Sequence, residues 1–534
     1  MASSPRTEKL QECATSSPAI IGQLRADLTH YTIPEVYEKL PQDAQDALEQ
    51  GIVFPAVRAL RQLGSADQVA ELARLFMLGD LLDPAEIAAA LPNTGLDQAA
   101  QIGLIRPGDQ DASKWQANFD LRPFSIDLPA VSPSAPAGQT RERTYWFLSD
   151  LGEDVTGEPL KPDHVLGIGG ATTSLLRLTP REPVESVLDI GTGCGIQAII
   201  AAAHATRVVA TDISLRALDM AAFNAALNQV TLDLRAGSML EPVAGERFNL
   251  IISNPPFVIT PRPTDAAGQP IMEYRDGGGQ DDSIVANLVQ DLPQVLADEG
   301  VAVMLGNWLL TEDDWAARPR TWLGDCDAWI IQRDSYNPAQ YAAMWLRDGG
   351  IEPRTQPTEF RQGISDYLDY FAQQQARGVG FGYLAIRATQ VRAPQHHFEE
   401  RVAGNPPSGQ DISRFFGVLD WLWETEGAEG DSSVQPLALS ERTVRQAADV
   451  TEERYHLPGQ PDPLIIMLHA GGSGQKVMVN SMFAALFGAC DGELNLGQIT
   501  QALAVLGDVE VTEVLGQVEE PLRQALLSGM LIPI

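Results

Sequence analysis

The chain has 534 residues and a formal net charge of −34, from 71 Asp and Glu against 37 Lys and Arg. Hydrophobic residues make up 44% and charged residues 20% of the sequence, which excludes a largely disordered chain. No apolar run approaches the roughly 18–20 residues that cross a bilayer, and the polar start, Met1–Ser17, has no secretory h-region. A generic nucleic-acid binder has a basic surface, which this chain as a whole lacks.

The cysteines and histidines predict neither a metal site nor a disulfide framework. The four cysteines are Cys13, Cys194, Cys326 and Cys490. They are far apart and form no CxxC pair, which favours a reducing cytoplasm. His396 and His397 have no partner at metal-ligand spacing and are expected in a solvated loop. The length suggests about three domains.

The first block, residues 1–135, is predicted to be a mainly helical module. Apolar residues recur at helical spacing in Ser65–Phe76. Asp83 and Glu86 predict a helix start, with Asp83 as N-cap and Glu86 closing a capping box. Alternation in Trp115–Leu121 predicts a strand. Short helices followed by a strand pair fit a winged-helix-like module, and a helical packing domain without a ligand fits equally well.

The central block, residues 136–392, is predicted to be an α/β domain with a mostly parallel, Rossmann-like sheet, because strand and helix patterns alternate within it. It lies between a Pro- and Ala-rich linker at Leu128–Gly138 and a second break near Arg392–Asp411. The seven expected strands are Ser186–Ile190, Arg207–Ile213, Thr231–Ala236, Phe248–Ser253, Val301–Asn307, Ala328–Arg333 and Tyr383–Arg387. A helical insertion at Asn337–Gln375 is a candidate part of the substrate face.

The last block, residues 410–534, is predicted to be a smaller α+β, winged-helix-like module. The aromatic stretch Phe415–Trp423 is expected to pack in its core. Two amphipathic helices after Asp491 are closed by Leu531–Ile534. The glycines of Gly471–Lys476 predict a hairpin turn, since the segment lacks the Gly-Lys-Ser/Thr ending of a phosphate loop.

The strongest chemical signal is Val187–Ile196, where an apolar strand ends in Asp189 and a Gly-x-Gly-x-Gly turn opens a helix. Glycines permit the sharp turn and let a ligand lie against the backbone. Ile196 stands where the NAD fingerprint requires glycine. The next strand ends in Asp212, and a carboxylate there can accept both hydroxyls of a ribose.

These residues resemble the first motif and the ribose acid of the class I S-adenosylmethionine-dependent methyltransferases. The resemblance covers roughly residues 140–390 and implies S-adenosyl-L-methionine as the cofactor. It implies that Asp189 orders the glycine loop and the amino-acid end of the cofactor, and that residues after the third strand flank the adenine. The cofactor-binding residues implied are Asp189, Gly191, Thr192, Gly193, Gly195, Asp212, Ile213, Ser238, Met239 and Asn254.

A second motif, Asn254-Pro255-Pro256-Phe257, resembles that of methyltransferases that modify planar nitrogen groups. The lone pair of such a nitrogen is delocalised, so acceptors at the Asn254 side chain and the Pro255 carbonyl are expected to draw both N–H groups toward tetrahedral geometry. The two prolines fix the backbone, and Phe257 can stack on a planar target. These four residues are the predicted catalytic residues. A second copy at Asn405 lacks the preceding strand and the aromatic, and is interpreted as a loop.

Further matches narrow the resemblance to the release-factor glutamine and ribosomal-RNA guanine or adenine methyltransferases. Ala222–Asn228 and Gly237–Val243 resemble segments of these enzymes. Ser238 stands where many relatives carry an acid, and Val258 where the guanine enzymes typically have His. Asp163–Gly170 is interpreted either as a lid over the cofactor or as a structural entry loop.

The sequence therefore predicts a cytoplasmic S-adenosylmethionine-dependent N-methyltransferase whose flanking modules deliver a macromolecular substrate. The preferred target is an exocyclic base amine of RNA, ahead of DNA, because the Asn-Pro-Pro-Phe form is common among base-amine enzymes. The alternatives are a protein glutamine methyltransferase and a non-catalytic scaffold of the same fold. No metal and no membrane partner are expected, and the oligomeric state stays open.

Overall fold

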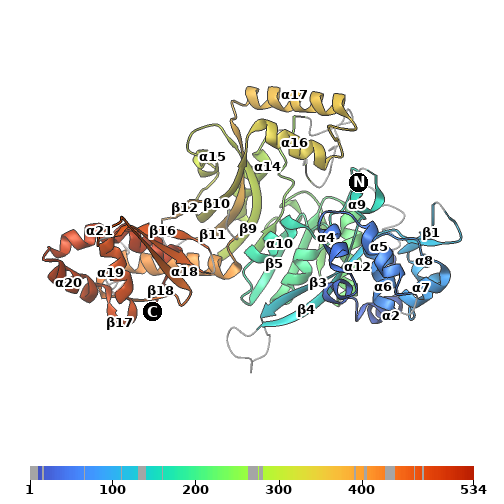
Figure 1. Cartoon of the computed structure of the whole chain (residues 1–534), viewed down its shortest axis with the longest axis horizontal. Helices are drawn as coiled ribbons and strands as arrows, with labels where there is room; N and C mark the ends of the chain where they lie inside the picture. Colours follow the sequence, from blue (N-terminus) through green and yellow to red (C-terminus); the bar gives the residue numbers. More distant parts are fainter. Residues whose placement is uncertain are drawn as a thin grey trace. The chain divides into compact units, whose positions relative to one another are not determined.

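The computed structural model describes residues 10–14, 17–64, 67–109, 111–129, 140–158, 160–261, 275, 281–389, 393–401, 406–426, 439–461, 463–471 and 474–534. The chain divides into two compact units (Figure 1). The first comprises Met1–Leu176, Arg181–Leu323 and Ser335–Gly382, and the second Arg177–Pro180, Gly324–Asp334 and Tyr383–Ile534. The predicted division at residues 135 and 392–410 stays a prediction.

The N-terminal part of the first unit is helical, as the periodicity indicates. Its helices are α2 (Pro18–Leu28), α3 (Ile33–Glu38), α4 (Gln42–Glu49), α5 (Phe54–Arg61), α6 (Gln68–Leu72), α7 (Pro84–Ala90) and α8 (Gly95–Gln101). The Asp83 side chain accepts from the Ala85 and Glu86 amides and forms the predicted capping box. The helix expected up to Phe76 continues α6 as a π-helical segment, Ala73–Met77. A winged-helix arrangement stays a prediction.

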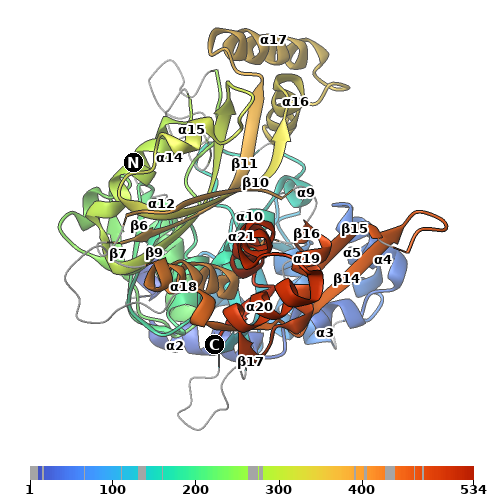
Figure 2. The ribbon, with the colours of Figure 1, turned by 90° about the vertical axis from the view of Figure 1, so that its left-hand side faces the viewer.

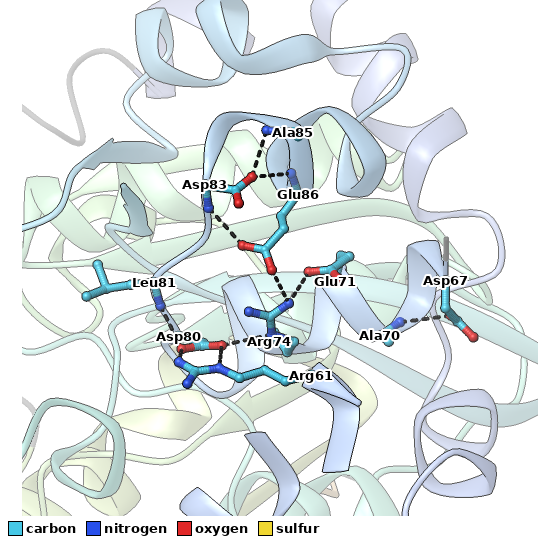
Figure 3. A network of polar contacts seen from close by, with 10 residues as sticks. All are labelled: Arg61, Asp67, Ala70, Glu71, Arg74, Asp80, Leu81, Asp83, Ala85 and Glu86. Carbon is cyan, nitrogen blue, oxygen red and sulfur yellow. Dashed lines mark hydrogen bonds and ion pairs between the residues drawn. The ribbon is translucent and has the colours of Figure 1, made fainter. Parts of the chain in front are cut away.

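A buried charge network joins α5, α6, the π-helical segment and α7 (Figure 3). The Arg74 guanidinium, 3% exposed, donates to Glu71 at 2.6 Å, Asp80 at 2.8 Å and Glu86 at 2.8 Å. Arg61 Nε donates to Asp80 at 2.9 Å. Burial raises the pKa of the Glu71 carboxyl to about 7. Three acidic groups around one arginine offset the cost of burying its charge.

A long antiparallel hairpin follows, formed by β3 (Asp120–Pro129) and β4 (Thr140–Ser149). Most of the predicted linker lies in residues 130–139, outside the described ranges. The strand expected at Trp115–Leu121 is divided between β2 (Trp115–Ala117), paired with β1 (Ile105–Pro107), and the start of β3.

Two asparagines attach this hairpin to helix α12 (Leu215–Leu227). Asn224 lies within the helix, and Asn228 is the residue that follows it. Asn224 Oδ1 accepts from the Leu148 amide at 2.8 Å, and Asn228 Oδ1 from the Trp146 amide at 3.0 Å. Helix α12 also contacts α2. The N-terminal helices, the hairpin and α12 therefore share one core.

The main sheet has eight strands in the order β12-β10-β11-β9-β8-β5-β6-β7. Their bounds are β5 Val184–Ile190, β6 Ala205–Asp212, β7 Asp233–Ala236, β8 Phe248–Ser253, β9 Leu296–Leu310, β10 Cys326–Tyr336, β11 Gly378–Ala388 and β12 His396–Glu400. The first seven overlap the seven predicted strands and confirm the α/β class. Chain order reverses at β5, between β6 and β8, and ligands of open parallel sheets bind at such a switch point.

The eighth strand corrects one expectation. His396 and His397 do not lie in a solvated loop but open β12, which pairs in parallel with β10 through Ala328 and Trp329. Its sequence, His-His-Phe-Glu-Glu, has no apolar run to indicate a strand. An edge strand pairs through its backbone N–H and C=O groups and does not need apolar side chains on both faces. The hydrophobic pattern therefore does not predict this strand.

The predicted insertion is helical. Helices α16 (Pro338–Asp348) and α17 (Pro357–Gln373) lie side by side in Figures 1 and 2. Asn337 and Gln340 form a capping box that starts α16. Between these helices and the sheet is an aromatic cluster whose buried members include Tyr341, Tyr367 and Phe371.

The second unit contains the C-terminal module. Its helices are α18 (Gly409–Glu426), α19 (Ser481–Ala489), α20 (Leu496–Gly507) and α21 (Val511–Leu527). Its strands are β13 (Thr443–Gln446), β14 (Val450–His456), β15 (Pro463–Ala470), β16 (Lys476–Val479), β17 (Asp491–Asn495) and β18 (Leu531–Pro533). They form two three-stranded sheets, β17-β13-β18 and β14-β15-β16.

Several predictions for this module are confirmed. Phe415 and Phe416 of α18 are buried, and the Phe415 ring stacks on Trp329 with 4.5 Å between centroids. The two amphipathic helices are α20 and α21, and β15 and β16 form the expected hairpin around Gly471. In the described ranges no helix combines the length and apolar character needed to cross a membrane.

Candidate active site

A cavity of about 930 Å³ opens at the carboxyl ends of the central strands of the first unit. Its volume is in the range of sites that bind small organic ligands. The predicted residues that line it are Asp189, Gly191, Thr192, Gly193, Asp212, Ile213, Ser238, Met239, Asn254, Pro255 and Pro256. Two predicted residues, Gly195 and Phe257, are not part of this lining.

The glycine turn between β5 and α11 (Ile196–Ala201) needs its glycines for different reasons. Gly191, Gly193 and Gly195 have φ values of 70°, 56° and 88°, which side chains rarely adopt. A Cβ on Gly193 would meet no atom within 4 Å, whereas one on Gly195 would lie 3.1 Å from the Ala221 Cβ. Gly193 therefore leaves its backbone open to a ligand, while Gly195 permits close packing on α12.

The Asp189 side chain, at the end of β5, holds this turn through hydrogen bonds. Its carboxylate, 2% exposed, accepts from the Thr192 hydroxyl at 2.6 Å and from the Ala198 amide at 3.2 Å. Burial raises the pKa of Asp189 to about 7, despite those two hydrogen bonds, which lower it. The carboxyl group therefore fixes the loop at its base.

Asp212 at the end of β6 binds two loops through its carboxylate. Oδ2 accepts from the Gly193 amide at 2.9 Å and Oδ1 from the Ser214 amide at 2.8 Å. Each carboxylate oxygen has a second lone pair, so acceptor capacity remains for a ligand hydroxyl. Burial raises the pKa of this carboxyl, against the effect of the backbone hydrogen bonds. The ribose contact of Asp212 stays a prediction.

The wall beyond Asp212 is formed by the turn after β7. The Gly237 amide donates to the Asp212 carbonyl at 3.0 Å. A Cβ on Gly237, whose φ is 155°, would lie 2.5 Å from Pro242, so only glycine fits there. Ser238 and Met239 follow, and Met239 has the left-handed φ of 46°. This backbone places both residues on the cavity, where adenine contact is predicted.

The Asn-Pro-Pro turn is the second wall of the cavity. Asn254 Oδ1 is buried and has no hydrogen-bond partner among the described residues. Pro255 and Pro256 beside it have no amide to donate. An unpaired buried acceptor costs free energy unless a ligand supplies a donor, so Asn254 is an acceptor available to a substrate N–H group.

Phe257 has an aromatic packing partner within the fold, and its stacking on a substrate stays a prediction. Its ring contacts Phe381 edge to face, with 6.4 Å between centroids and 88° between planes. It packs against the aromatic cluster under α16 and α17 rather than lining the cavity. The motif alone predicts an aromatic next to the turn but not the direction of its ring.

No local pattern in the sequence predicts the ion pair between Asp150, which lines the cavity, and Arg216. Arg216 of α12 donates to both carboxylate oxygens of Asp150, at 2.5 and 2.6 Å. Asp150 also accepts from the Val165 amide at 2.8 Å, and Arg216 donates to the Asp163 carbonyl at 2.9 Å. The segment that the sequence presents as a lid or entry loop is thus fixed to α12. Burial lowers the pKa of His164 within it.

Two family models match parts of the chain. The "Methyltransferase small domain" model matches residues 167–312, and a model described as "Domain of unknown function (DUF7059)" matches residues 28–116. The first match contains the glycine turn, Asp212 and the Asn-Pro-Pro turn. The predicted site residues that line the cavity therefore all lie within the matched residues, whereas other parts of its lining, such as Asp150 and Asp348, lie outside them.

Curated proteins agree with that match, and one solved structure is reported with them for comparison. A release factor glutamine methyltransferase of Geobacter sulfurreducens is 33% identical over 227 residues, covering 40% of this chain and 73% of the relative. A ribosomal protein uL3 glutamine methyltransferase of Bradyrhizobium diazoefficiens is 32% identical over 166 residues, 28% of this chain and 52% of the relative. The ribosomal protein L11 methylase structure from Lactobacillus delbrueckii subsp. bulgaricus has a TM-score of 0.25 at 19% identity, covering 42% of this chain and 81% of that one.

The fold and the site define a class I S-adenosylmethionine-dependent methyltransferase. Within that class, the chain belongs to the family that includes the release factor and ribosomal protein glutamine methyltransferases. The chain spans about half the length of several curated relatives, 52% of the Bradyrhizobium enzyme and 44% of a Staphylococcus aureus release factor glutamine methyltransferase.

S-adenosyl-L-methionine, the cofactor of this family, fits the residues present. The open backbone at Gly193, the remaining acceptor capacity of Asp212 and the volume of the cavity all suit a nucleoside with an amino-acid tail. Among the described residues, no group of three or more His, Cys, Asp or Glu side chains is arranged to hold a metal ion.

Proposed function

We propose that the protein methylates the side-chain amide nitrogen of glutamine in a protein substrate, with S-adenosyl-L-methionine as methyl donor. The observation that carries the proposal is the buried, unpartnered Asn254 Oδ1 on the wall of the cavity. A carboxamide NH₂ group has two hydrogens to donate and a weakly nucleophilic nitrogen. Methylation of this nitrogen therefore requires a hydrogen-bond acceptor such as Asn254 Oδ1 to bind and orient the NH₂ group.

The residues of this chain would contribute to catalysis by orienting the glutamine amide. Asn254 Oδ1 and the Pro255 carbonyl would accept the two N–H groups of the glutamine amide, so that the nitrogen lone pair is freed from the carbonyl. The bound cofactor supplies an electrophilic methyl group on sulfur. The amide nitrogen would take this methyl group, S-adenosylhomocysteine would leave as the neutral thioether, and one N–H proton would pass to water. Positioning and electrostatic matching carry most of such catalysis.

A protein target replaces the base amine that the sequence favoured, because the comparisons give no support to a nucleic-acid substrate. The similar curated proteins named above carry protein substrates in their names. The Phe257 ring, expected to stack on a base, is turned toward Phe381. Carboxylates also line the cavity, namely Asp120, Asp150, Glu153, Asp163 and Asp348, and with the charge of −34 they disfavour a phosphate backbone.

The experiment uses the full chain with methyl-labelled cofactor and three substrates: a bacterial release factor, ribosomal protein uL3 and total RNA. We expect label in protein, resistant to nuclease, and mass spectrometry should locate one added methyl group on a glutamine side chain. Asn254→Ala should abolish most of this label. Label that is lost with nuclease and kept with protease would overturn the proposal in favour of a base amine. Absence of label in all three with intact cofactor binding would favour the scaffold alternative.

A further inference from the structure

The Asn-Pro-Pro turn has few backbone hydrogen bonds of its own. Pro255 and Pro256 lack the N–H group that would attach the turn to its surroundings. Before the turn, Ser253 is fixed by its strand pairing and by its hydroxyl, which donates to the Ile190 carbonyl at 3.0 Å. The position of Asn254 therefore depends on how the chain is held after the second proline.

The residues after the prolines are held by the insertion helix α16 and by Arg275. The Val258 amide donates to the Arg275 carbonyl at 3.0 Å, and the Arg275 side chain donates to the Trp345 carbonyl of α16 at 3.3 Å. The Ile259 amide donates to the Tyr341 hydroxyl oxygen at 2.8 Å. Ile259 is fully buried, so water does not replace this acceptor. Phe257 packs on Phe381, a ring that Tyr341 also contacts with 5.7 Å between centroids. The amide in question lies five residues from Asn254.

Tyr341 is itself rigidly placed. Its side chain is fully buried, and its hydroxyl also accepts from Asn307 Nδ2 of β9 at 3.1 Å. Its ring contacts Tyr367 and Phe371 of α17, with 6.1 and 5.6 Å between centroids. One hydroxyl group thus joins the strand β9, the helix α16 and the chain after the catalytic turn.

We infer that Tyr341 is a positioning residue for methyl transfer: its hydroxyl fixes Ile259 and thereby the location of Asn254. Helix α16 lies beyond residues 167–312, which the methyltransferase model matches. This chain therefore supports its catalytic turn with an element outside the matched domain. The same helix ends in Arg347 and Asp348, which line the cavity, so α16 contributes both to the cavity wall and to the support of the turn. The inference rests on the proposed methyl transfer.

The test is Tyr341→Phe in the full chain. This change keeps the ring and its packing but leaves the buried Ile259 amide without an acceptor. We expect kcat to fall on the order of 10–100-fold, as for a small misplacement of a reacting group, with the Kd for S-adenosylmethionine unchanged. Amide hydrogen exchange in the peptide after Pro256 should become faster.

The matched control is Tyr336→Phe. Tyr336 packs against the same aromatic cluster and contacts Phe381 edge to face, with 5.5 Å between centroids. The hydroxyl that accepts from Ile259 belongs to Tyr341, so kcat and exchange after Pro256 should stay near wild type in this control. In an Asn254→Ala background, Tyr341→Phe should cost little further activity, because both changes act through one group.

Two results would overturn the inference: equal kcat losses in Tyr341→Phe and Tyr336→Phe, or full additivity of Tyr341→Phe with Asn254→Ala. If the wild-type protein transfers methyl to none of the substrates, the proposed function fails. Hydrogen exchange after Pro256 and cofactor affinity would still decide whether Tyr341 holds the turn.

Discussion

The two sides of the cavity are built in different ways. The predicted cofactor side is local, because its residues come from two consecutive strand–helix turns. Asp189 accepts from the Thr192 hydroxyl, and Asp212 accepts from the Gly193 amide. The substrate side is assembled from distant segments, because Asn254 ends β8 while Tyr341 and Phe381 come from the insertion and β11. The first arrangement follows from a short motif, and the second exists only after the sheet has formed.

This difference predicts separable effects. Changes on the cofactor side should appear in cofactor affinity or in stability, because the backbone there is the binding surface. Changes on the substrate side should appear in turnover, because orientation of one polar atom is what that side contributes.

The largest effect is expected for Asn254→Ala. Removing one preorganised polar contact to a reacting group costs about 10²–10³ in rate. The Kd for S-adenosylmethionine, measured by calorimetry, should change little, since the prolines still set the turn. Asn405→Ala, in the second Asn-Pro-Pro sequence, is the matched control and should be silent. The reverse pattern would place the active site elsewhere.

Asp212→Ala should act mainly on cofactor binding. Hydrogen bonds to a charged group contribute about 1.5–3 kcal/mol, so the affinity should fall about tenfold or more. The Gly193 and Ser214 amides also lose their acceptor. Asp233→Ala, which removes a more exposed carboxylate on the neighbouring strand, is the comparison variant. Unchanged affinity in folded Asp212→Ala protein, titrated by calorimetry, would contradict the ribose assignment.

Asp189 should make stability depend on pH. Its pKa in the fold, about 7, lies above the ordinary value of 3.8, so the folded state holds the proton more tightly than the unfolded state. The stability that this gives is complete below about pH 4 and is lost as pH rises toward about 7. Asp189→Asn does not titrate. The free energy of unfolding of wild type minus that of the variant should therefore fall across this window, as urea titrations would measure. A constant difference would mean that Asp189 is already charged in the fold.

Phe257→Leu should have the smallest effect. The substitution keeps an apolar side chain but loses the edge-to-face contact with Phe381, a contact that contributes about 0.5–1.5 kcal/mol. We expect a modest drop in the urea midpoint and less than about a tenfold loss in kcat. A raised KM for substrate at unchanged stability would instead show that the ring contacts the substrate.

The flanking regions show which structural features can be predicted from the sequence and which cannot. The capping boxes and amphipathic helices were visible because their signals lie within a few residues of one another. The charge network around Arg74 was not, since its partners Asp80 and Glu86 meet it only when the helices pack. Strand β12 was missed for a related reason: its pairing partner β10 is distant in the chain.

The sequence by itself determined the α/β class, the seven central strands and the cofactor turn, because periodicity, glycine conformation and strand-ending acids are local properties of the chain. Only the tertiary structure decided that Phe257 contacts Phe381, that Asp150 pairs with Arg216, and that the Tyr341 hydroxyl accepts from the Ile259 amide after the Asn-Pro-Pro turn. Those contacts join residues from 66 to 124 positions apart: 216 − 150, 341 − 259 and 381 − 257. A side chain's direction and its distant partner depend on the packing of the whole unit, for which no short motif carries a signal.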